Sequence, residues 1–269
     1  MSTPSLFDAA RACLEAEAPE EKVALTERHA AAFLRGELAI PDHASPPRPI
    51  GMPGRPPRPR LVPARELPQR GLGTPAGLAA FVHAIAHIEL NAIDLAWDAA
   101  YRFRGLPREY YADWIGVASD EARHFVLLRA RLRELGHDYG DFNAHNGLWE
   151  MVEKTAHDGL ARMALVPRVL EARGLDVTPG MIGRLRNLGD HATAEILELI
   201  LREEVAHVAV GSRWFRWYCE RAGVEPHSTF RQLLATHAGP VLRGPFNHPA
   251  RLAAGFDAEE IAALEQLSG

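Results

Sequence analysis

The feature that most constrains this chain is a short motif that occurs twice inside long helical patterns. A glutamate is followed three residues later by a histidine, first as Glu121 and His124 and again as Glu204 and His207. Three residues along an α-helix turn the chain by about 300° and raise it by about 4.5 Å, so both side chains of a motif leave the same face. The doubled motif favours an all-α protein with two such helix faces.

A lone glutamate precedes each motif at a matching distance. Glu89 lies 32 residues before Glu121, and Glu171 lies 33 residues before Glu204. In an antiparallel helix pair, two residues are level when they are equally far from the turn. Both pairs therefore place a glutamate level with a Glu-x-x-His motif, provided that each turn falls at the midpoint.

Turn residues stand at both midpoints. Gly105 is the midpoint of the first pair, inside Arg104–Pro107, and it reads as a helix stop followed by a first-turn proline. Gly189 and Asp190 directly follow the second midpoint as a helix stop and an N-cap. Two helical hairpins are therefore predicted.

The helix faces around these glutamates are apolar. Residues three, four, seven and eight positions from Glu89, Glu121 and Glu204 are mostly aliphatic or aromatic, which predicts that the carboxylates face the core. Carboxylates in a core repel one another and are costly to desolvate, and two cations remove that cost. The pattern is typical of a two-metal carboxylate site in a four-helix bundle, with these ligands: Glu89, Glu121, His124, Glu171, Glu204 and His207.

Each ligand has an expected role. Glu121 and Glu204 bridge or chelate the metals, Glu89 and Glu171 take terminal positions, and the two histidines bind one metal each. Hard carboxylates with one imidazole per metal suit two iron ions, or manganese with iron, better than copper or a closed zinc site. The four glutamates are accordingly the expected catalytic residues.

Four regions follow one another along the chain. Residues 1–40 form N-terminal helices, 41–74 an extended Pro/Arg-rich arm, 75–222 the antiparallel four-helix bundle and 223–269 a C-terminal helical extension. The third bundle helix is predicted to break just past Glu171, at 174–180, and to resume through Met181–Asn187. The arm is expected to wrap the bundle with solvated arginines, and phosphate contact is the alternative.

Several further groups are expected to be structural or on the surface, because helix height or phase separates them from the ligands: Glu153, His157, Glu195, His83 and His87. Asp120 and Glu203 precede the motif glutamates. Either could accept a hydrogen bond from a ligating histidine of a neighbouring helix, or simply be a solvated charge.

Bulk properties bound the setting. The net charge is −5, and the two cysteines, Cys13 and Cys219, provide no disulfide framework. No apolar run is expected to reach membrane-span length and no signal-peptide pattern opens the chain, so we expect a cytoplasmic protein without membrane contact.

The six-residue ligand pattern resembles the ferritin-like superfamily. The stretches Asp120–Phe125 and Leu170–Asp176, together with the arginine–proline arm, are similar to a bacterial ferritin-like family known mainly as a domain of unknown function. Leu170–Arg173 also resembles, locally, the tRNA hydroxylase that acts on methylthio-isopentenyl-adenosine. The resemblance implies a two-iron centre, or one of manganese and iron.

Three functions compete. The chain is expected to be an O₂-dependent hydroxylase or oxidase of a small organic substrate, supplied by an external electron donor. The sequence leaves the oligomeric state open, with a small homo-oligomer as one alternative. A ferroxidase or iron-handling protein is the second function. A tRNA-modifying oxygenase is the third, with the net charge against nucleic-acid binding. A bundle with a purely structural metal is the non-enzymatic alternative.

Overall fold

The computed structural model describes residues 4–42, 45–237 and 243–268. Across these ranges the chain is helical, and two isolated β-bridges are the only extended pairings. The all-α prediction is therefore confirmed. The chain divides into two compact units, residues 1–150 and 151–269, and each is described by itself.

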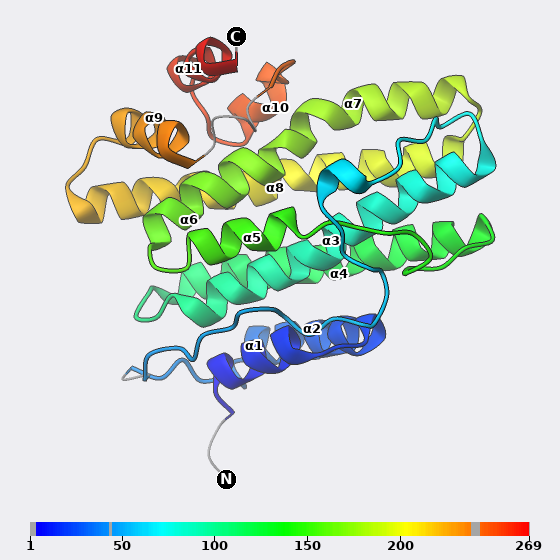
Figure 1. The fold of residues 1–269 in the computed structure, drawn as a ribbon. Helices are drawn as coiled ribbons and strands as arrows, with labels where there is room; N and C mark the ends of the chain where they lie inside the picture. The colour runs from blue at the N-terminus through cyan, green and yellow to red at the C-terminus, as the bar shows by residue number, and fades with distance from the viewer. Residues whose placement is uncertain (1–3, 43–44, 238–242, 269) are drawn as a thin grey trace. The chain divides into compact units, whose positions relative to one another are not determined.

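The first unit is built on a long helical hairpin, α3 (Pro75–Arg102) and α4 (Arg108–Glu134), whose helices pack along their lengths (Figure 1). The Thr74 side chain caps the start of α3 by accepting a hydrogen bond from the Gly77 N–H. Gly105 lies in the turn with a φ of +68°, a backbone conformation that favours glycine. The predicted hairpin thus has its turn where the midpoint placed it.

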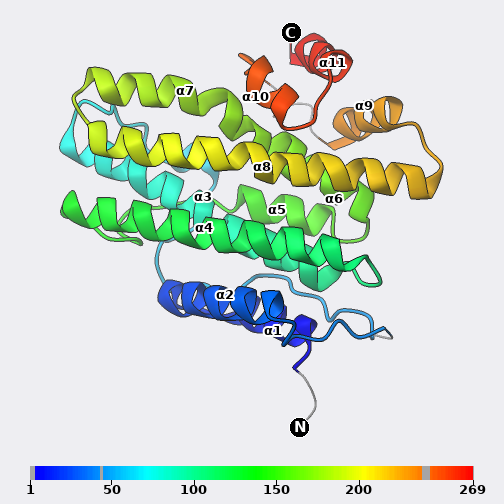
Figure 2. The same ribbon diagram turned by 180° about the vertical axis from the view of Figure 1, so that it is seen from behind.

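Two N-terminal helices cover this hairpin. α1 (Leu6–Glu15) packs on α3, and α2 (Pro19–Leu34) packs on α4 (Figure 2). A buried ion pair joins Lys22 Nζ to Asp94 Oδ1 at 2.5 Å. The indole N–H of Trp97 donates to Thr26 Oγ1 at 2.9 Å.

The proline-rich arm is fastened to the first unit, as predicted. Over residues 45–74 its backbone carries one short helix, η1 (Ala64–Glu66), and the Gly54 N–H donates to the Leu14 carbonyl. The expectation that all of its arginines are solvated is wrong at Arg55. That side chain is only 13% exposed and donates to Asn91 Oδ1, because α3 presents an amide and, at Asp94, a carboxylate to it.

One expectation about membranes also needs correction. By length and composition alone, α3 is apolar enough to cross a bilayer. However, 61% of its most apolar window is buried inside the protein, which is the character of a core helix. Buried polar residues interrupt the apolar run, including His83, His87 and Glu89, so the sequence does not show one continuous apolar span.

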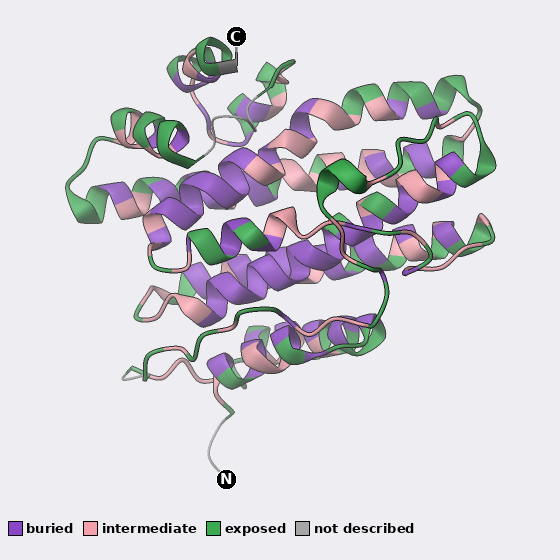
Figure 3. Cartoon of the chain, in the orientation of Figure 1, coloured by how far each residue is buried: buried purple, intermediate pink, exposed green. Residues whose placement is uncertain are grey.

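The second unit pairs an irregular helix with a long regular one. α6 (Gly159–Leu165), the π-helix η2 (Val166–Glu171) and α7 (Ala172–Asn187) follow without interruption and pack against α8 (His191–Ala222). Asp190 caps α8 by accepting from the Thr193 N–H, as the sequence predicted. Figure 3 shows the buried stretches of these helices in purple.

The predicted break at 174–180 is wrong. α7 continues through this stretch with Pro179 inside it, and the irregular turn is η2, which ends at Glu171. A proline in a helix leaves the carbonyl four residues earlier without its usual donor. That carbonyl belongs to Leu175, and it accepts a hydrogen bond from Asn247 Nδ2 at 3.0 Å. A partner distant in sequence therefore satisfies the helix at its proline.

The rest of the third predicted helix is also divided. α5 (Gly147–Lys154) ends before α6 begins, and Asp158 caps α6. After α8 come α9 (Pro226–His237), α10 (His248–Ala253) and α11 (Ala258–Ser268). The described part of the predicted C-terminal helical extension is thus helical over these three elements. Residues 238–242, between α9 and α10, lie outside the described residues.

Candidate metal centre

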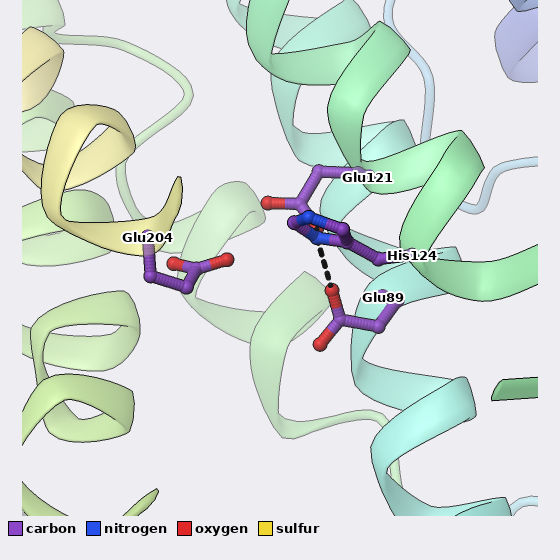
Figure 4. A group of neighbouring side chains, drawn as sticks. All are labelled: Glu89, Glu121, His124 and Glu204. Carbon is purple, nitrogen blue, oxygen red and sulfur yellow. Dashed lines mark hydrogen bonds and ion pairs between the residues drawn. The ribbon is translucent and has the colours of Figure 1, made fainter. Parts of the chain in front are cut away.

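Three predicted ligands meet inside the first unit. Glu89 comes from α3, while Glu121 and His124 come from one face of α4, and their exposed fractions are 4%, 1% and 0%. His124 Nδ1 lies 3.1 Å from Glu89 Oε2 and 3.3 Å from Glu121 Oε2 (Figure 4). One ligand atom from each residue lies within 4.8 Å of the others. The hairpin therefore brings the three residues to one height.

Burial governs the electrostatics of this cluster. Desolvation, and then the negative charge of Glu121, raise the pKa of Glu89 to about 8. Burial alone lowers the pKa of the His124 imidazole, but hydrogen bonds with Glu121 and Glu89 and their charges outweigh it and raise that pKa to about 11. The cluster therefore retains protons, because two carboxylates in a dry site need a positive partner.

The donor set fits a metal ion that takes the place of those protons. Two carboxylates and one imidazole nitrogen converge, and their ligand atoms are close enough to share one ion. Oxygen-rich sets of this kind suit iron or manganese. The cluster can thus hold a cation.

The second unit carries the other three predicted ligands. Glu204 and His207 lie on one face of α8, and His207 Nδ1 is 3.4 Å from Glu204 Oε1. Their side chains are 13% and 3% exposed. Glu171 is the last residue of η2, which packs against α8, and it is half-buried. Figure 4 also draws Glu204, which belongs to this unit.

The residues predicted to be structural or on the surface lie in such places. Glu153, His157 and Glu195 are exposed. His83 and His87 are buried core residues. Burial lowers the pKa of His87 to about 3, and its ring nitrogens lie 2.7 Å from the Tyr139 hydroxyl and 3.1 Å from the His145 carbonyl.

Asp120 has a partner on its own helix, since Arg123 donates to its carboxylate at 2.9 Å. Glu203 is half-buried on α8.

Arg168 is a buried arginine in η2, three residues before Glu171, and the sequence analysis did not identify it as a residue of interest. A usable signal was present, because Arg168 is the lone charged residue in the apolar stretch 163–170. A charge at the centre of an apolar helix usually has a dedicated partner.

Comparisons with known proteins agree over most of the chain. The model of a family described as "Protein of unknown function (DUF455)" matches residues 15–262. A protein of Haemophilus influenzae, described as an uncharacterized protein, is 44% identical over 213 residues, which cover 77% of this chain and 74% of that protein. No solved structure matches the chain significantly. The chain belongs to the DUF455 family.

Proposed function

We propose that this protein is a di-metal carboxylate oxidoreductase of the ferritin-like type, which uses O₂ to hydroxylate or oxidise a small organic molecule. The observation that carries the proposal is the buried cluster of Glu89, Glu121 and His124, together with the repeat of its pattern at Glu171, Glu204 and His207. The two hairpins would form one four-helix bundle that supplies six ligands to two ions.

The bound group would be two iron ions, or one manganese and one iron, and it would supply the binding and reduction of O₂. Six protein ligands for two metals leave coordination positions open, as a reactive site needs and a closed structural site does not. Glu121 and Glu204 would hold the ions with their carboxylates. Glu89 and Glu171 would be terminal ligands, and each histidine would bind one ion.

The surrounding residues have their own tasks. Glu89 and Glu121 are almost completely shielded from water, so a cation there would be held by strong, unscreened charges. Apolar neighbours of Glu89 on α3 are buried with it, among them Ala86 and Ile93. Trp97 is fully buried, and its indole N–H donates to Thr26 in the core.

The electron donor, the cellular compartment and the oligomeric state are also proposed. An external reductant would deliver electrons, and the buried, unpaired thiols of Cys13 and Cys219 suit a reducing cytoplasm. A small homo-oligomer is compatible with this activity, whereas a ferroxidase with a storage role would assemble into a cage.

A tRNA-modifying oxygenase is the second candidate, because most arginines of the arm remain exposed: Arg48, Arg58, Arg60, Arg65 and Arg70. Exposed arginines on an extended segment can contact phosphate. In this case tRNA binding would weaken with salt and with Arg58→Ala and Arg60→Ala.

The test combines metal analysis with turnover. Aerobically purified protein should contain about two iron or manganese ions per chain and show the optical bands of an oxidised di-iron centre. With a reductant and O₂, it should oxidise a molecule recovered from a metabolite or tRNA mixture. Multi-turnover oxidation of added Fe²⁺ by a cage-sized assembly would instead identify a ferroxidase. A colourless, metal-free preparation would refute the proposal.

A further inference from the structure

We propose that Arg168 is a positioning residue. It anchors the π-helix η2 to the C-terminal segment, residues 243–268, and thereby fixes Glu171 against α8. This inference deepens the proposed function and rests on Glu171 being a metal ligand.

The Arg168 side chain lies in a closed cage. It is 0% exposed, and its Nη2 donates to Glu260 Oε1 at 2.5 Å. The guanidinium carbon lies 4.2–4.7 Å from the ring centres of Phe215, Phe230 and Phe256. Among the described residues, Nε and Nη1 have no hydrogen-bond partner, so the aromatic faces stabilise the rest of the cation. Arg168 thus joins η2 to α8, α9 and α11.

Stability alone does not require an arginine at this position. Desolvating a guanidinium and a carboxylate costs several kcal/mol per ion, and apolar replacements of buried ion pairs are often neutral or stabilising. What the pair adds is direction, because a hydrogen-bonded guanidinium binds its partner in a defined orientation. The cage is therefore suited to fix the register of the turn that carries it.

The turn needs such fixation. A π-helix is less favourable than an α-helix and persists where tertiary contacts impose it. Pro167, next to Arg168, also removes a backbone donor. In addition, Gly211 of α8 touches Pro167 so closely that a Cβ at Gly211 would overlap the proline ring. Gly211 lies four residues beyond His207, so this contact fixes η2 on the stretch of α8 that carries the ligands.

The C-terminal segment also holds the chain beyond Glu171. Arg251 of α10 donates to both carboxylate oxygens of Asp176 at 2.9 and 2.7 Å. Asn247 donates to the Leu175 carbonyl, as described above. Arg168 lies three residues before Glu171, and Leu175 and Asp176 lie four and five residues after it. Residues of the C-terminal segment bind all three. Glu171 sits between two anchored points.

The experiment compares Arg168→Met with Arg162→Met in the full chain. Arg162 is a matched control, since it is equally buried in the same unit and donates to Thr155 Oγ1 and the Val152 carbonyl. Cobalt(II) is titrated into apo protein without oxygen, and its absorption bands report affinity and ligand geometry. Urea unfolding of the apo forms reports stability separately.

Arg168→Met should bind cobalt about 10- to 100-fold more weakly, which is the usual effect of losing a group that orients a ligand. Its cobalt bands should also change, because one carboxylate is misplaced. Arg168→Lys, which keeps the charge, should recover part of the affinity. Arg162→Met should unfold at lower urea concentration but bind cobalt as the wild type does.

Wild-type affinity and spectrum in Arg168→Met would overturn the proposal, and so would an equal loss of affinity in Arg162→Met. If Arg168→Met does not fold, Glu260→Leu carries the same test, because it removes the acceptor of the Arg168 hydrogen bond. Unchanged binding in that variant would be equally contrary. A wild-type protein that binds no cobalt would refute the metal centre itself, which separates that failure from a failure of the Arg168 proposal.

Discussion

The two units carry the same ligand motif on different backbones. In the first unit, Glu89, Glu121 and His124 extend from uninterrupted α-helices and contact one another directly. In the second unit, Glu171 ends a π-helix, and one extra residue in a turn rotates the following chain by about 100°. Local helix geometry therefore brings one set of proposed ligands together, whereas tertiary contacts hold the other set in place.

The largest effect is expected from removing one motif glutamate from each unit, which tests whether both units bind metal. Glu121→Ala and Glu204→Ala should each reduce the bound metal from two ions per chain to one or none. Metal-loaded wild type should melt at a higher temperature than either variant, since a ligand at about 100 times its Kd stabilises by about 2.7 kcal/mol. Metal analysis and thermal melting measure both effects.

Glu195→Ala is the control for this pair, because Glu195 is exposed on the same helix as Glu204. It should retain the wild-type metal content. If Glu204→Ala kept two ions, the assignment of α8 ligands would be wrong.

A pH series tests the electrostatics of the buried cluster in the first unit. The folded pKa values of Glu89, about 8, and His124, about 11, lie above their ordinary values, so the folded apo protein binds protons more tightly than the unfolded chain. Stability from Glu89 is therefore complete below about pH 4.5 and is lost as the pH rises through 8. Stability from His124 is lost between about pH 6.5 and 11.

We expect the melting temperature of the apo protein to fall by several degrees between pH 6 and pH 9, at about 2–4 °C for each kcal/mol lost. Glu89→Gln should flatten this dependence, and metal affinity should rise with pH because the ions displace protons. An apo protein whose stability rises over this range would contradict the electrostatic account of the cluster.

The smallest expected effect concerns the proline in α7. Asn247→Ala should cost about 1 kcal/mol, because the Leu175 carbonyl loses its donor. In a Pro179→Ala background the helix regains its own N–H, so the same substitution should cost less. Urea unfolding of the four proteins in this cycle measures the coupling. Equal costs in both backgrounds would show that Asn247 does not compensate for the proline.

The sequence predicted what periodicity and turn chemistry control. The α3–α4 hairpin, its turn at Gly105 and the N-cap at Asp190 follow from local patterns, and so does the convergence of Glu89 with Glu121 and His124. The sequence could not locate the irregular turn, because Pro167 and Pro179 both signal a break. Their outcomes depend on distant partners.

These long-range partners explain why the sequence did not predict the structure at Pro179 and Arg168. Pro179 is tolerated because Asn247 satisfies the exposed carbonyl, a contact made across 72 residues of sequence. Arg168 is tolerated in the core because Glu260 and three phenylalanine rings surround it. Periodicity within a window does not contain such long-range contacts.

We propose above that the two Glu-x-x-His motifs supply one centre of two ions. Magnetic resonance of the iron-loaded, oxidised protein tests it most directly, because ions that share bridging carboxylates are magnetically coupled. We expect about two irons per chain and a coupled pair that gives no resonance signal in the diferric state. Isolated high-spin ferric signals that account for all the iron, or a single ion per chain, would contradict it.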